Sequence, residues 1–87
     1  MPQENTTLFD FDELNTESTR KVLEEVYDAL EERGYNPVNQ IVGYLISGDP
    51  GYISSYKNAR NKMQETDRAK IVEILLQEFR KAKKWDI

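Results

Sequence analysis

The chain has 87 residues and contains neither cysteine nor histidine, which excludes disulfides, zinc fingers and nucleophilic catalysis by either residue type. No apolar run approaches the roughly 18 residues of a membrane-spanning helix, and no signal peptide precedes the domain, so we expect a cytoplasmic protein without membrane insertion. No calcium-binding loop and no glycine-rich phosphate loop is present, so we expect no metal and no cofactor. A domain near this length buries about 60% of its unfolded surface, so contact with a second copy would add stability.

The net charge of −4 is distributed unevenly along the chain. Residues 1–15 carry four acids and no base, whereas residues 57–84 carry nine bases and four acids. Opposite charges at the two ends of the sequence favour attraction between them, within one chain or across a dimer.

The first residues are polar and acidic, and no helical periodicity there is long enough to define a helix. We therefore predict a flexible acidic arm over residues 1–14 and a helical domain over residues 15–87. Thr6 and Thr7 are the hydroxyl residues of the arm. A phosphate on either would add about −1.5 to −2 charges.

Phosphorylation of the arm could have either of two effects. It could bind basic residues such as Arg60 and Lys62, or it could lose an apolar contact made by Leu8 and Phe9. The sequence does not choose between these outcomes.

The predicted helices begin with an amphipathic helix over about Thr16–Arg33, where apolar residues recur at helical spacing. Gly34 suits the left-handed position that ends such a helix. Asn36 and Pro37 are the N-cap and first-turn residues of a second helix, predicted over about Pro37–Ser47.

The second predicted helix is apolar over a wide arc, so we expect it to be central to the core. Gly43 in its middle costs about 0.5–1 kcal/mol relative to alanine, which indicates that another helix approaches closely. That helix could belong to a second copy of the chain. The residues expected in the core or at a dimer contact of this helix are Ile41, Val42, Gly43 and Leu45.

The rest of the chain predicts further short helices. Gly48 ends the second helix, and Asp49-Pro50 repeats the cap-plus-proline signal. A short helix is expected over about residues 55–64, and Thr66 is expected to cap a last helix over about residues 67–84. No strand pattern competes, so the expected class is all-α, a homodimeric domain of four or five helices.

The second half of the chain carries a predicted partner-binding basic surface made of Lys57, Arg60, Lys62 and Arg68. Short helices separated by Gly and Pro turns resemble helix-turn-helix spacing, so a small nucleic-acid-binding regulator is an alternative. The isoelectric point of about 4.8 argues against it. An enzyme is disfavoured because the available acids lie mainly on helix surfaces. A structural dimer without switching is a third possibility.

The segment from Val26 to Pro50 closely resembles the IreB/ReoM family of small bacterial regulatory phosphoproteins. The most specific parts are Gly34-Tyr35-Asn36-Pro37 and Ser47-Gly48-Asp49-Pro50. The similarity continues at Tyr52-Ile53 and Asn58-Ala59-Arg60, resumes loosely at Asp67-Arg68 and Ile71-Val72-Glu73, and covers most of residues 22–79.

The resemblance implies an all-helical homodimer without catalytic activity. It implies control by a membrane Ser/Thr kinase with extracellular PASTA domains and by the cognate phosphatase. Family members act on envelope stress responses, peptidoglycan precursor supply and cephalosporin tolerance. In one branch they influence Clp-dependent turnover of a peptidoglycan-precursor enzyme.

The resemblance also implies where phosphorylation falls. Family members are phosphorylated on a threonine of the N-terminal arm in a context that Thr7-Leu8-Phe9 matches, with Thr6 as a secondary acceptor. The family carries additional arginines where this chain has Ser55 and Gln64. The basic surface is therefore thinner here, which leaves the choice of partner open.

Overall fold

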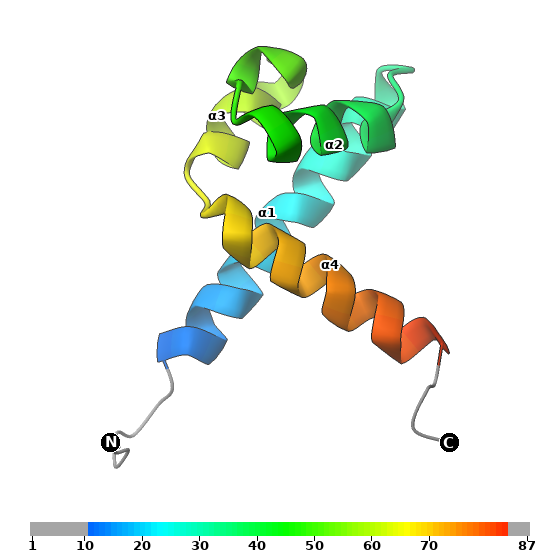
Figure 1. Cartoon of the computed structure of the whole chain (residues 1–87). Coiled ribbons are helices and arrows are strands. Elements are labelled where there is room, and N and C mark those ends of the chain that lie inside the picture. The colour runs from blue at the N-terminus through cyan, green and yellow to red at the C-terminus, as the bar shows by residue number, and fades with distance from the viewer. Residues whose placement is uncertain (1–10, 84–87) are drawn as a thin grey trace.

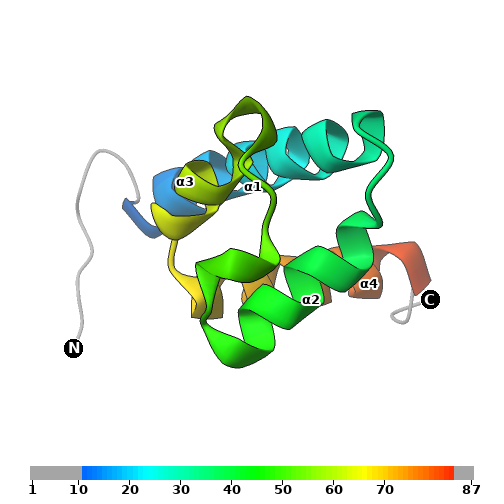
Figure 2. The same cartoon turned by 90° about the horizontal axis from the view of Figure 1, so that it is seen from above.

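The computed structural model describes residues 11–83 and is all-helical within that range, as predicted. Figure 1 shows a long α1 that runs through the molecule, with α2 and α3 beside its second half and α4 crossing it. Seen from above in Figure 2, α1 and α3 lie on one side and α2 and α4 on the other. In order, the elements are α1 (Phe11–Glu32), α2 (Pro37–Ser47), η1 (Pro50–Tyr52), η2 (Tyr56–Asn58), α3 (Ala59–Gln64) and α4 (Arg68–Lys83), where η denotes a 3₁₀ helix.

The start of α1 differs from the prediction. The helix begins at Phe11 rather than near Thr16, so its first turn falls inside the predicted arm. A short stretch without long apolar periodicity can therefore extend a helix whose later turns are held by packing. Residues 1–10, which include Thr6 and Thr7, lie outside the described residues.

The end of α1 and the start of α2 agree with the local signals. Gly34 has φ of +88°, and the N–H groups of Gly34 and Tyr35 donate to the carbonyls of Glu31 and Leu30, both at 3.0 Å. This pattern is a Schellman motif. The Asn36 side chain accepts a hydrogen bond from the N–H of Asn39 at 3.1 Å and caps α2.

The end of α2 also agrees with the prediction. Gly48 has φ of +76°, and its N–H donates to the carbonyl of Tyr44 at 2.7 Å. Asp49 then accepts a hydrogen bond from the N–H of Gly51 at 2.8 Å and caps η1. The two connections, from α1 to α2 and from α2 to η1, are thus defined by residues that lie close together in sequence.

The helix predicted over residues 55–64 is broken. η2 comes first, and α3 begins only at Ala59. Lys57 and Asn58 have φ of +51° and +65°, a left-handed pair that reverses the chain between the two elements. Side chains from η2 bond to the end of α1, so contacts distant in sequence hold this conformation.

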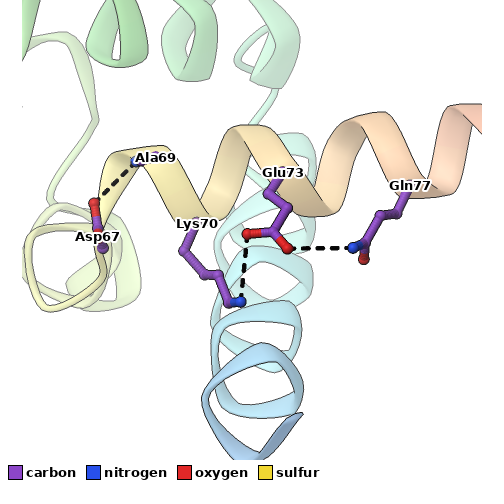
Figure 3. A network of polar contacts seen from close by, with 5 residues as sticks. All are labelled: Asp67, Ala69, Lys70, Glu73 and Gln77. Atoms are coloured by element: carbon purple, nitrogen blue, oxygen red, sulfur yellow. Dashed lines mark hydrogen bonds and ion pairs between the residues drawn. The ribbon is translucent and has the colours of Figure 1, made fainter. Parts of the chain in front are cut away.

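The cap of α4 is Asp67 rather than the predicted Thr66. The hydroxyl of Thr66 donates to the carbonyl of Met63 at 2.8 Å, across the turn that ends α3. The carboxylate of Asp67 accepts from the N–H of Ala69 at 3.0 Å, as Figure 3 shows. Threonine and aspartate both suit an N-cap. Here the Thr66 hydroxyl bonds to the end of α3, and Asp67 caps α4.

The core lies where α1, α2, α3 and α4 meet. It draws on all four α-helices and on the loop after η1. Because α1 contributes Val26 and Leu30 from its second half, the core is concentrated at one end of the long helix. Its members are Val26, Leu30, Ile41, Tyr44, Ile53, Ala59, Met63 and Ile71.

Candidate functional site

α2 is apolar on two sides, and only one side packs into the core. Ile41 and Tyr44 are buried. Val38, Val42 and Ile46, spaced four residues apart, are 55%, 45% and 80% exposed. A helix at the surface of a soluble domain normally presents polar residues away from its core, so this second apolar stripe is a candidate contact surface.

α4 has the same property. Ile71 and Ile74 are buried against the rest of the domain. Its other large apolar side chains are at least two-fifths exposed and lie on an adjoining part of the helix surface, where Leu75 is one turn after Ile71. These residues are Val72, Leu75, Leu76 and Phe79.

An apolar groove of about 300 Å³ is lined by residues of α1, α2 and α4. Leu23 and Tyr27 come from α1, Val38 and Val42 from α2, and Leu75 from α4. We call the groove and the two stripes together the apolar face. It consists of Leu23, Tyr27, Val38, Val42, Ile46, Val72, Leu75, Leu76 and Phe79.

The four residues predicted as core or dimer contacts on α2 have different surroundings in the structure. Ile41 and Val42 both line the groove, but Ile41 is buried and Val42 is 45% exposed, and Leu45 is half-buried. Gly43 lies under the ring of Tyr52, where an added Cβ would be 2.5 Å from Cδ1 of that ring. Within the chain, the close neighbour of Gly43 is therefore an aromatic side chain of η1 and not another long helix.

Two members of the predicted basic surface pair with acids of α1. Nζ of Lys57 lies 2.7 Å from Glu32, and Nζ of Lys62 lies 3.4 Å from Glu25. The hydrogen bond from Lys57, with a second from the Tyr56 hydroxyl, lowers the pKa of Glu32, and the same carboxylate raises the pKa of Lys57. These lysines therefore pair with two of the acidic side chains of α1.

The two arginines of the basic surface bind main-chain carbonyls. Nε of Arg60 donates to the carbonyl of Ile53 at 2.9 Å. Nη1 of Arg68 donates to the carbonyl of Leu45 at 3.0 Å. Both therefore hold the chain around η1, and the four predicted residues do not form a single cluster of unpaired charge.

An ion cluster that the sequence did not indicate joins α1 to α4. Arg20 of α1 contacts Oε2 of Glu78, and Nζ of Lys81 lies 3.7 Å from the same oxygen. Lys81 and Glu78 lie three residues apart on α4, but Arg20 and Glu78 are 58 residues apart, so no local spacing indicates the contact between the helices. For the apolar face, the sequence did offer a signal: α4 has more large apolar residues than one buried side of a helix needs.

A second polar network lies nearer the start of α4. Lys70 is only 7% exposed, and its Nζ lies 3.4 Å from Glu73, which also accepts a hydrogen bond from Gln77 at 3.3 Å. Figure 3 shows the Lys70 side chain extending from α4 toward α1. The three residues all belong to α4, so the printed contacts of this network join successive turns of one helix.

Neither a metal site nor a membrane span is found in residues 11–83. No group of three or more acidic side chains there is arranged to hold a metal ion. No helix in this range is long and apolar enough to cross a bilayer.

The sequence comparison agrees with the resemblance carried by the turns. The family described as IreB regulatory phosphoprotein matches residues 4–81. That match includes α1 to α3, nearly all of α4 and the segment with both arm threonines. The chain therefore belongs to the IreB family of regulatory phosphoproteins.

Proposed function

We propose that this protein is a non-enzymatic regulator that acts by binding other proteins and is switched by phosphorylation of Thr7, with Thr6 as a secondary acceptor. Family membership supports the regulatory role. The observation that carries the binding role is the apolar face, because so many large apolar side chains rarely remain in water on a monomer.

The proposed pathway follows from the family resemblance. A membrane Ser/Thr kinase with extracellular PASTA domains phosphorylates the arm, and its partner phosphatase reverses the modification. The regulated process is peptidoglycan synthesis in the cytoplasm, through a Clp-protease-linked or precursor-synthesising enzyme. Cephalosporin tolerance is the expected phenotype.

The apolar face is also the proposed contact of a homodimer. A two-fold dimer brings the same patch of each copy together, so a self-complementary surface is required. The apolar face combines exposed side chains of α2 and α4 with a groove, and a second copy of the same face would cover them. Val42, at the edge of the groove, is the predicted dimer residue best placed for such a contact.

The proposed switch is tested by incubating the protein with the cognate kinase and ATP and mapping phosphate by mass spectrometry. We expect modification at Thr7 that is lost in Thr7→Ala. The kinase's own autophosphorylation serves as the activity control. Unmodified Thr6 and Thr7 in the presence of active kinase would overturn the proposal.

The cellular role requires a separate test. Thr7→Ala and Thr7→Glu strains should differ from wild type in survival under a cephalosporin. If both behave as wild type, the protein is a structural dimer without switching.

A further inference from the structure

The groove of the apolar face has an acidic border on α1. Glu24 is one of the residues that line the groove, and it precedes Tyr27 by three residues, whereas Glu31 follows Tyr27 by four. Residues three and four apart lie on the same side of an α-helix, so both carboxylates flank Tyr27. Within residues 11–83, neither Glu24 nor Glu31 forms an ion pair. This border favours an occupant that carries positive charge next to apolar side chains.

The bases of α1 on this side do not cancel the acidic border. Arg20 already contacts Glu78 of α4. Lys21 is exposed and precedes Glu24 by three residues, so it reduces the negative charge there. Glu31 lies about 15 Å further along the helix axis than Lys21, which leaves its carboxylate without a neighbouring base of α1. Acids therefore remain in excess along the groove.

The end of α4 combines an apolar surface with positive charge. Leu76 is 63% exposed, and Arg80 and Lys83 follow it by four and seven residues, so the three lie on the same side of the helix. In the described part of the chain neither of these bases forms an ion pair, whereas the two acids of α4, Glu73 and Glu78, are both paired with bases. Figure 1 shows the last turns of α4 projecting beyond the rest of the domain, where a second copy can contact them.

Charge decides which element of a second copy suits the groove. α2 carries no charged residue, so it offers no partner for Glu24 and Glu31. Contact between the two α1 helices would bring the acids together, and contact between the two ends of α4 would bring the bases together. The end of α4 against α1 pairs opposite charges, and two-fold symmetry makes this pairing twice in each dimer.

We propose that the end of α4 of each copy covers the groove of the other, with Leu76 against the apolar lining and with Arg80 and Lys83 beside Glu24 and Glu31. This inference rests on the proposed homodimer and adds the element that occupies the groove and the orientation of the two copies. Each of the two contacts takes its acids from one copy and its bases from the other, so neither copy completes the contact alone.

The test uses two charge-reversed variants of the full chain. Glu24→Lys/Glu31→Lys is the acid-reversed variant, and Arg80→Glu/Lys83→Glu is the base-reversed variant. A dimer of either variant with itself would bring like charges together at both contacts, so each should associate about tenfold or more weakly than wild type. Light scattering at several concentrations measures the association, and circular dichroism checks that each variant is folded. Added salt should reduce the difference between the variants and wild type, because it screens exposed charges.

Mixing the two variants tests the pairing itself. In a mixed dimer the introduced lysines of one variant meet the introduced glutamates of the other, and the second contact has the charges of wild type. An equimolar mixture should therefore recover dimers at concentrations where each variant alone is monomeric. Native mass spectrometry identifies the mixed dimer by its mass. Damage to the fold of either variant would not be repaired by mixing.

A matched control separates local pairing from overall charge. Asp28→Lys/Glu65→Lys makes the same charge change as the acid-reversed variant at exposed positions outside the apolar face, and it should dimerise as wild type does. If wild type is a dimer and both reversed variants associate as tightly, or if their mixture stays monomeric, the arrangement is overturned and the proposed homodimer stands. A monomeric wild type would overturn both.

Discussion

The guanidinium of Arg68 lies against Gly48 and donates a hydrogen bond to the carbonyl of Leu45, so the first residue of α4 holds the last turn of α2. A Cβ added to Gly48 would be 2.9 Å from Cζ of Arg68. Gly48 is therefore constrained twice, by its positive φ and by the contact with Arg68. Gly34 has a similar φ but no atom within 4 Å of an added Cβ, which makes it a matched control.

Gly48→Ala should destabilise the protein more than Gly34→Ala does. An alanine in the left-handed region costs about 1–2 kcal/mol at either site. At Gly48 the substitution should also displace Arg68 and weaken its hydrogen bond, for about 1 kcal/mol more. Denaturant unfolding measures both, and in an Arg68→Ala background the two substitutions should cost the same. A persistent difference there would show that Arg68 is not the cause.

Gly43→Leu should destabilise the fold by about 1–3 kcal/mol, because the new side chain overlaps the ring of Tyr52. Thermal unfolding measures the loss. The same substitution in a Tyr52→Ala background should cost much less, because the ring that it overlaps is gone. An equal cost in both backgrounds would indicate that another neighbour, such as a second copy, occupies the space beside Gly43.

Leu76→Glu and Val38→Glu should each prevent self-association while leaving the domain folded. Both side chains are more than half exposed in one copy, so the charge costs little until the apolar face is covered. Light scattering at tens of micromolar should give a dimer for wild type and a monomer for the variants. Asn61→Glu, on the exposed surface of α3, is the control and should remain dimeric. A monomeric wild type would refute the proposed dimer.

The Glu32–Lys57 pair should contribute a pH-dependent part of the stability. The pKa of Glu32 is lowered in the folded state, so its contribution is present above the pKa of the unfolded chain and is lost as pH falls through the folded value. The pKa of Lys57 is raised, so its contribution is present below the unfolded pKa and is lost as pH rises through the folded value.

Denaturant unfolding of Glu32→Gln checks this sign. The variant should be less stable than wild type at neutral pH, and the difference should shrink in the acid range where Glu32 becomes protonated. Glu31→Gln, at the exposed neighbouring position, should show a smaller effect at neutral pH. A difference between wild type and Glu32→Gln that does not change with pH would rule out the ion pair as its source.

The amino-acid sequence by itself determined the helix ends from Gly34 to Asp49 and the all-helical class. Gly34 and Gly48 adopt left-handed backbone, and Asn36 and Asp49 bond to N–H groups two or three residues away. Such interactions are local, so neighbouring residues suffice to define them. The turns also carry the family signature.

Only the tertiary structure decided which apolar side chains are covered and which charges meet. Val42 and Ile41 are adjacent, apolar and both line the groove, yet Val42 is 45% exposed and Ile41 only 5%. The break at Lys57, the pairing of that lysine with Glu32 and the meeting of Arg20 with Glu78 all join distant parts of the chain. These features depend on how the helices cross, and the crossing is set by the summed packing of the whole core rather than by any local sequence pattern.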